Sequence, residues 1–146
     1  GWATLSAARQ ALVLDASLAL SWALPDEASA YCDDVLDKVA VSGAVVPGLW
    51  THEMANGLLM AQRRGRLTTA QRMAFVEQLL HLAIEVEISN ARSVLDGQVA
   101  LAERYALTAY DAAYLDLALR RGFPLATQDK AMKVAARKAG VVLVER

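Results

Sequence analysis

At residues 12–17 the chain reads Leu-Val-Leu-Asp-Ala-Ser, a short apolar run that ends in a carboxylate. Consecutive large apolar residues are typical of a strand that is buried on both faces of a parallel sheet. A carboxylate left without a partner at the end of such a strand would cost several kcal/mol or lose its charge. We interpret Asp15 as a metal ligand. The alternative is a contact with Ser17, which we expect to begin a helix that runs to residues 22–24.

Apolar runs and helical patterns alternate along the rest of the chain. Short apolar runs at 44–46, 124–127 and 141–144 predict three further strands, and apolar residues alternate with glutamates at 84–88, as in a strand at a sheet edge. The predicted fold class is α/β, with three α/β/α layers around a short, mainly parallel sheet of about five strands. Apolar residues at helical spacing predict helices at 28–41, 51–64, 68–82, 91–105, 109–121 and 129–138, of which the second and third form a helical hairpin.

Four carboxylates are expected to meet at one edge of this sheet. Asp15 follows the first strand, Glu53 lies in the first turn of the helix after the second, and Asp129 follows the strand at 124–127. In parallel α/β sheets, sites form beyond the carboxyl ends of the strands. Asp111 continues the apolar, inward-facing stripe of its own helix, so we expect it to point toward the other three acids.

Such a group of carboxylates favours a divalent metal site. Carboxylates that converge repel one another, and hard ions with oxygen ligands, such as Mg²⁺ or Mn²⁺, neutralise that repulsion. One or two ions of this kind acidify a bound water and stabilise charge on the leaving oxygen of a phosphodiester. Simpler explanations exist for three of the acids: Asp129 as a helix cap, Asp111 in a capping box with Thr108, and Glu53 through its helix dipole.

Polar residues near these acids are candidates for supporting roles. Ser17 and Thr127 each lie two residues from a candidate acid, so we expect them to hydrogen-bond a carboxylate or a bound water. Asn56 follows Glu53 by about one helical turn and is predicted to orient it, with a polar surface position as the alternative. The candidate contacts to substrate phosphates are Arg63, Arg64, Arg66, Lys130 and Lys133, although the arginine cluster also suits the solvated end of a helix.

The composition fits a single domain at 11–146 in a chain of 146 residues. Hydrophobic residues make up 55% of the chain, but no uninterrupted apolar run approaches the roughly 18 residues of a membrane-spanning helix. Residues 1–10 lack an initiating Met and a long apolar segment, so we interpret them as an extension that need not be native rather than as a signal peptide. The single Cys32 suits a packed thiol in a reducing compartment, and we expect a cytoplasmic location.

Four segments together carry a family pattern. They are Leu-Val-Leu-Asp-Ala-Ser at 12–17, Val-Pro-Gly-Leu-Trp-Thr-His-Glu at 46–53, Thr-Ala-Tyr-Asp-Ala-Ala-Tyr at 108–114 and Leu-Ala-Thr-Gln-Asp at 125–129. In this order and spacing the chain resembles PIN-domain ribonucleases, specifically the VapC-type toxins of bacterial and archaeal toxin–antitoxin systems. The resemblance covers almost everything from Leu12 to Val144 and selects the same four acids.

The resemblance implies an activity, a cofactor and partners. It implies a type II toxin that cleaves RNA internally with Mg²⁺ or Mn²⁺, forms a homodimer, and is neutralised by a cognate antitoxin lying across the helical hairpin. By match, Asp15 and Asp111 would be the principal metal ligands, Glu53 and Asp129 would complete the acidic pocket, and Thr127 would be the hydroxyl residue before the last acid.

Two other classes of function remain open from the residues alone. One is a non-catalytic α/β domain that binds metal for regulation, but a receiver-like site would show paired acids after the first strand, where this chain has only Asp15. The other is a DNA-directed nuclease of the same fold. A two-carboxylate phosphatase is disfavoured because Ser17 stands where its second acid would be.

Overall fold

The centre of the structure is a sheet of four parallel strands. In the computed structural model, which describes residues 11–145, the strands lie in the order β3 (Ile84–Glu87), β2 (Ala44–Pro47), β1 (Leu12–Leu14) and β4 (Leu125–Ala126). Val13 pairs with Val45 on one side and with Leu125 on the other. All three residues of β1 are buried, as expected for a strand covered on both faces. The predicted edge strand is β3.

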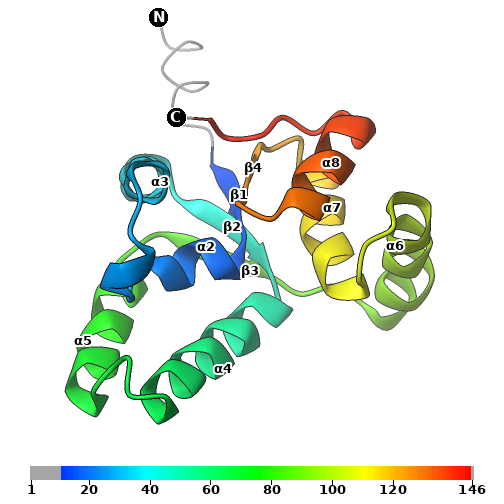
Figure 1. Ribbon diagram of the computed structural model, residues 1–146. Coiled ribbons are helices and arrows are strands. Elements are labelled where there is room, and N and C mark those ends of the chain that lie inside the picture. The colour runs from blue at the N-terminus through cyan, green and yellow to red at the C-terminus, as the bar shows by residue number, and fades with distance from the viewer. Residues whose placement is uncertain (1–10, 146) are drawn as a thin grey trace, which may run out of the picture.

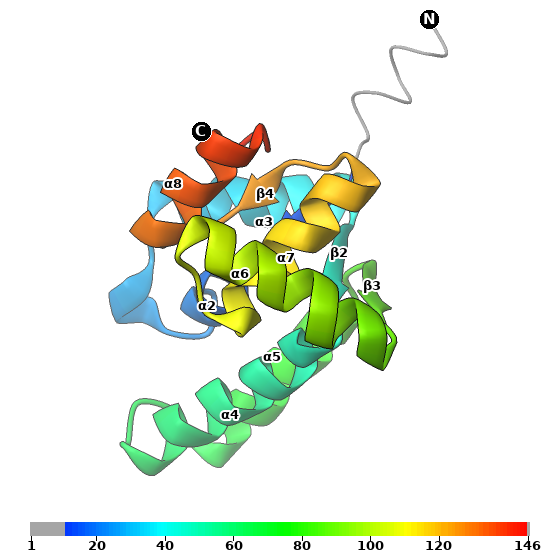
Figure 2. The same ribbon diagram turned by 90° about the vertical axis from the view of Figure 1, so that its right-hand side faces the viewer.

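Helices cover both faces of this sheet. Those of the described residues are α2 (Ala16–Ser21), α3 (Ala30–Ser42), α4 (Leu49–Arg63), α5 (Thr69–Leu80), α6 (Val99–Tyr105), α7 (Ala109–Arg121) and α8 (Lys130–Ala139), with a short 3₁₀ turn η1 (Pro25–Glu27) and a π-helical segment η2 (Ser93–Gln98). Figure 1 shows α3 beside one face and α7 with α6 beside the other, so the predicted three layers are present. The α4–α5 hairpin projects away from the sheet in both views (Figures 1 and 2).

Local sequence signals explain most helix ends. Ser29, Thr68 and Thr108 precede α3, α5 and α7, and each side chain accepts a hydrogen bond from a backbone N–H of the first turn. Thr68 and Gln71 form a complete capping box. At the other ends, α3, α7 and α8 stop at residues with positive φ, which are Gly43, Gly122 and Gly140.

Two helices begin earlier than predicted. Asp15, not Ser17, caps α2, because its carboxylate accepts a hydrogen bond from the Ser17 N–H at 3.4 Å. The helix α4 begins at Leu49, directly after Gly48 and without a side-chain cap, and not at Thr51. Glu53 therefore lies in the second turn of α4 rather than in the first.

The predicted fifth strand at 141–144 is reduced to a single bridge. Leu143 pairs with Leu125 in parallel, and no strand of more than this bridge follows α8 in the described residues. Because β4 has only two residues, it offers too short an edge for a longer partner. A second difference is that the predicted helix at 91–105 contains η2, where the helical turn is wider than in an α-helix.

The core lies between the sheet and the two helical layers. Its largest fully buried side chains include Tyr114, Leu117 and Met132, which come from α7 and α8. Cys32 is buried and not in a disulfide, as predicted for a packed thiol. None of the helices in the described residues is long and apolar enough to cross a membrane. The extension predicted at 1–10 falls outside the described residues.

Candidate active site

The acidic edge of the sheet is built on the pairing of β1 with β4. Leu14 pairs with Ala126, so the next residues, Asp15 and Thr127, leave the sheet side by side at its carboxyl edge. The Asp15 N–H also donates to the Ala126 carbonyl oxygen at 3.1 Å, which extends the ladder to the acid itself. Strand register alone therefore brings together two residues that are far apart in the sequence.

Asp15 is buried and surrounded by hydrogen-bond donors. It is only 6% exposed. Thr127 Oγ1 donates to Asp15 Oδ2 at 2.7 Å, and Ser17 Oγ donates to the same oxygen at 3.1 Å. Both hydroxyls predicted to support an acid thus contact this carboxylate. The other oxygen, Oδ1, accepts the Ser17 N–H at 3.4 Å as the cap of α2, so capping accounts for part of the environment of Asp15.

Asp129 lies at the start of α8 and is tied to Asp15 through Thr127. Its N–H donates to Thr127 Oγ1 at 3.1 Å, and its Oδ2 accepts from the Met132 N–H at 2.8 Å as the helix cap. The hydroxyl of Thr127 therefore accepts from one acid's backbone and donates to the other's carboxylate. Asp129 is exposed, and capping occupies only one of its carboxylate oxygens.

Glu53 reaches the site from α4 and is held by a tyrosine of α7. The Tyr114 hydroxyl donates to Glu53 Oε1 at 2.7 Å. Burial raises the pKa of Glu53, the Tyr114 bond opposes this, and the charges of Asp15 and Asp111 raise the pKa further. Burial also raises the pKa of the Tyr114 hydroxyl, which stays protonated and serves as a donor.

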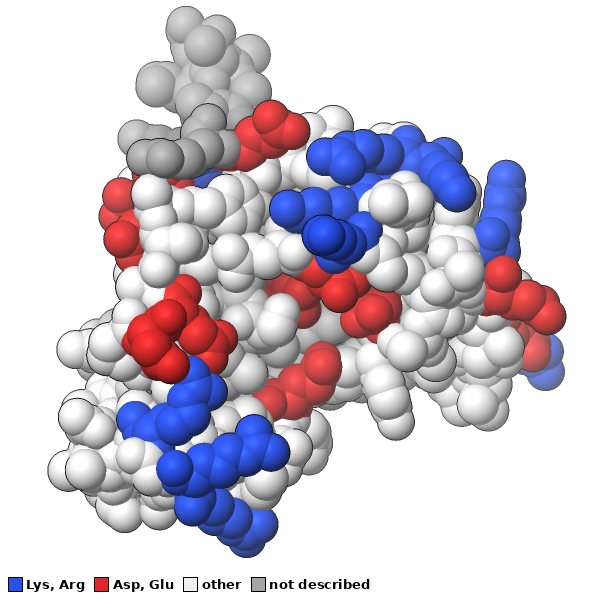
Figure 3. Space-filling view, in the orientation of Figure 1, with Lys and Arg blue, Asp and Glu red and all other residues white. Residues whose placement is uncertain are grey.

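Asp111 lies in the first turn of α7, where its N–H donates to Thr108 Oγ1 at 3.1 Å. Burial raises the pKa of its carboxyl group, and the charges of Asp129 and Asp15 raise it further, against an opposing hydrogen bond with Thr108. The charges of Asp15 and Asp129 thus affect the ionisation of Asp111, and those of Asp15 and Asp111 affect the ionisation of Glu53. Figure 3 shows acidic side chains gathered near the centre of the face between α8 and α4.

The four acids suit a hard cation by the chemistry of their oxygen atoms, although they do not form a complete coordination shell. Their donors are carboxylate oxygens, whose charged forms are disfavoured by burial and by mutual repulsion. Among residues 11–145, no three acidic, histidine or cysteine side chains stand close enough together to hold one ion as placed. The four acids converge electrostatically without forming a complete coordination shell.

Comparison with known proteins identifies the family. A model of the PIN domain matches residues 12–138. The chain belongs to the PIN-domain family. It is 30% identical over 119 residues to Ribonuclease VapC3 of Pyrobaculum aerophilum, an alignment that covers 82% of this chain and 89% of the relative. The crystal structure of PAE2754 from Pyrobaculum aerophilum has a similar fold, with a TM-score of 0.68 and 24% identity over 93% of this chain and 85% of that one. The predicted resemblance and fold class are confirmed.

The predicted phosphate contacts of this PIN domain differ in their availability. Arg63 and Arg64 are exposed at the tip of the α4–α5 hairpin, and Lys130 is exposed at the start of α8. Lys133 is half-buried on the same helix. Arg66 is held by Asp26 at 3.0 Å and Glu27 at 2.6 Å, which leaves it less available to phosphate than its neighbours.

One residue of the PIN-domain site, Asn56, differs from its predicted role, and another, Tyr114, was missed. Asn56 is exposed, and none of the hydrogen bonds of the described residues joins its side chain to Glu53. Tyr114 holds Glu53 instead, and no role was predicted for it. The signal that could have found it is general: a buried tyrosine hydroxyl needs a hydrogen-bond partner, and Tyr114 lies three residues after Asp111 on the same helix face.

Proposed function

We propose that this PIN domain is a divalent-metal-dependent endoribonuclease and the toxin of a type II toxin–antitoxin pair. The observation that carries the proposal is the convergence of four carboxylates from four separate segments at the carboxyl edge of β1 and β4. Burial and mutual charge raise the pKa of two of them, Glu53 and Asp111, and a bound cation would favour their ionised forms. Ribonuclease VapC3, to which the chain is 30% identical, carries the name of a ribonuclease.

Asp15 and Asp111, with Glu53 and Asp129, would hold one or two Mg²⁺ or Mn²⁺ ions. Such an ion supplies a lowered pKa for a coordinated water and charge stabilisation for the leaving oxygen of a phosphodiester. The protein's own contribution is to fix the orientation of the ligands, because pre-organised groups need not be reordered during reaction.

Three hydroxyl groups provide this orientation. Thr127 and Ser17 hold one oxygen of Asp15, and Tyr114 holds one oxygen of Glu53. Oε2 of Glu53 therefore accepts no hydrogen bond from the described residues, and Oδ1 of Asp15 accepts only the long 3.4 Å bond from the Ser17 N–H. Cations around the acids would attract the RNA backbone, which the acids alone would repel.

The partners proposed are RNA, a cognate antitoxin and a second copy of the chain, in the cytoplasm. The α4–α5 hairpin supports the antitoxin site, because Leu59, Met73 and Leu80 expose apolar surface along it. A segment with an apolar face would bury these side chains. The proposed homodimer rests on the family alone.

The test is cleavage of single-stranded RNA by purified protein with Mg²⁺ and with a chelator. We expect cleavage only with metal, and a loss of at least about 100-fold in Asp15→Asn, because the variant removes a charged ligand. Asp37→Asn is the matched control, since Asp37 is an exposed acid on α3. Undiminished cleavage in chelator or in Asp15→Asn would refute the mechanism. Equal cleavage of a DNA strand of matched sequence would refute the restriction to RNA.

A further inference from the structure

A hollow of about 400 Å³ is lined in part by Thr127 and Gln128, the two residues before Asp129. It lies between α8, the end of β4 and the C-terminal segment, and Thr127 and Gln128 form the wall nearest to the acids. The same Thr127 donates its hydroxyl to Asp15. Thr127 therefore lies between Asp15 and the hollow and contacts both.

Two cations of α8 line the hollow. Lys133 and Arg137 are four residues apart, so their side chains rise from the same helix face about 5–6 Å apart. Neither side chain forms an ion pair or hydrogen bond with other described residues, whereas carboxylates hold Arg120 and Arg121. Glu145 is the acid of the lining, so cations outnumber acids there. Figure 3 shows this basic surface over α8, above the acidic group.

The remaining wall offers an apolar surface with one polar edge. Tyr31 and Leu143 are half-buried in it, and the Tyr31 hydroxyl donates to the Val144 carbonyl oxygen at 2.8 Å. This bond fixes the ring at the side of the hollow. Aromatic and aliphatic faces bind nucleobases with little sequence preference, and the exposed amide of Gln128 has both a donor and an acceptor for a base edge.

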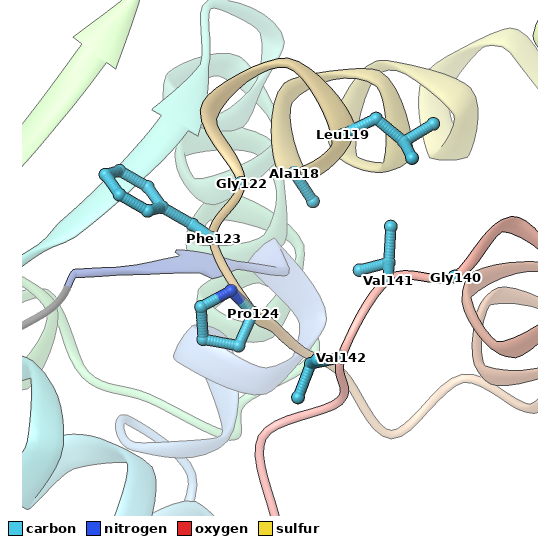
Figure 4. Close-up of a pocket in the computed structure, with 8 residues that line it drawn as sticks. All are labelled: Ala118, Leu119, Gly122, Phe123, Pro124, Gly140, Val141 and Val142. Atoms are coloured by element: carbon cyan, nitrogen blue, oxygen red, sulfur yellow. The ribbon is translucent and has the colours of Figure 1, made fainter. Parts of the chain in front are cut away.

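A second hollow lacks these features. It lies where β4 begins, at the edge of the sheet opposite to the acids, and Figure 4 shows its lining. That lining has no charged side chain and consists of Ala118, Leu119, Gly122, Phe123, Pro124, Gly140, Val141 and Val142. Of these two hollows, the one lined by Thr127 combines cations, an aromatic ring and an amide, and the other does not.

We propose that the hollow beside α8 is a subsite for the nucleotide adjacent to the scissile phosphate of single-stranded RNA. Lys133 and Arg137 contact the phosphate of that nucleotide and of the next one, and its base lies against Tyr31 and Leu143. The RNA strand then leaves the acids along α8 rather than along the hairpin. This inference rests on the proposed ribonuclease function for its substrate class.

The test measures binding without cleavage and cleavage with metal. A labelled single-stranded RNA of mixed sequence, about ten nucleotides long, is titrated by fluorescence anisotropy in chelator at several salt concentrations. We expect Lys133→Gln/Arg137→Gln to weaken binding at least tenfold and to reduce the slope of log K against log salt by about 1.4, for two lost phosphate contacts. In Mg²⁺ the same variant raises KM more than it lowers kcat.

Lys38→Gln/Lys138→Gln is the control, because it removes the same charge from exposed positions outside the hollow. It should stay within about twofold of wild type, as expected for charges that touch no phosphate. Equal weakening in both variants, or wild-type binding by Lys133→Gln/Arg137→Gln, would overturn the subsite. If the wild type cleaves RNA and Lys133→Gln/Arg137→Gln binds and cleaves it equally well, the subsite is refuted and the ribonuclease function is not. If Lys133→Gln/Arg137→Gln weakens RNA binding but the wild type cleaves no RNA, the ribonuclease function is refuted and the binding site is not.

Discussion

At the scale of single residues, Tyr114 has the clearest consequence. It is fully buried, and its hydroxyl joins α7 to Glu53 of α4. We predict that Tyr114→Phe lowers the free energy of unfolding by about 1–3 kcal/mol, because it leaves a half-buried carboxylate oxygen without its donor. RNA cleavage should fall about tenfold as Glu53 loses its fixed orientation. Urea unfolding and cleavage assays measure the two effects.

Tyr110→Phe is the control for this prediction. Tyr110 lies on the same helix and is 67% exposed, so the loss of its hydroxyl should change neither quantity. If Tyr114→Phe cleaves RNA like the wild type while its stability falls, the hydroxyl has only a structural role.

Gly43 sets a prediction at the scale of elements, where α3 turns into β2. Its φ is +78°, and a Cβ there would lie 2.7 Å from the Ala83 carbonyl oxygen, a backbone atom that cannot move aside easily. Gly65 has a similar φ of +75° but open space around it. We predict that Gly65→Ala costs about 1 kcal/mol for the backbone conformation alone and that Gly43→Ala costs at least about twice as much. Equal losses in denaturant unfolding would remove the steric explanation.

The link between β3 and α7 predicts a pH dependence. Arg120 and Arg121 contact Glu87 at 2.7 Å and 2.8 Å. Burial alone would raise the pKa of Glu87, but hydrogen bonds from the two arginines outweigh it and lower the pKa. Because the folded-state pKa is lowered, the contribution of Glu87 to stability is present above its unfolded pKa of about 4.3 and is lost as the pH falls through the folded value.

Glu87→Gln should therefore destabilise the protein at neutral pH, and its difference from wild type should shrink as the pH falls below about 4. Urea unfolding at a series of pH values measures this difference. Glu103→Gln, at an exposed position of α6, should show no such convergence. A difference that stays constant down to acid pH would mean that Glu87 stabilises by packing and not by charge.

At the scale of the whole molecule, the sequence predicts the sheet and most helices because their signals are local. Apolar runs mark β1 and β2, and Thr68 and Thr108 mark helix starts. Contacts between distant segments carry no such signal. The bond from Tyr114 to Glu53, the shortening of the last strand and the capture of Arg66 by η1 all depend on how the elements pack. Asp15, Glu53 and Asp129 were predicted to meet because strand ends in a parallel sheet share one edge, and Asp111 was added because of its place on the inward-facing stripe of its helix.

The acids also predict how the whole molecule responds to metal. Since burial and neighbouring charges raise the folded-state pKa of Asp111, the stability that it allows is fully present below its unfolded pKa of about 3.9 and falls as the pH rises through the folded value. At neutral pH in chelator, Asp111→Asn should therefore melt at a higher temperature than the wild type, and the difference should vanish near pH 3, below about the unfolded pKa.

Divalent ions should reverse the order of the two melting temperatures, so that the wild type melts above Asp111→Asn. An ion that binds only the folded state stabilises it in proportion to its occupancy, so Mg²⁺ or Mn²⁺ should raise the melting temperature of the wild type and raise that of Asp111→Asn less. Asp37→Asn, at an exposed position of α3, should respond to metal like the wild type. If Asp111→Asn melts below the wild type in chelator at neutral pH, the carboxylates do not repel one another enough to require an ion. Their convergence would then serve the capping of α2 and α8, where Asp15 and Asp129 already accept backbone hydrogen bonds.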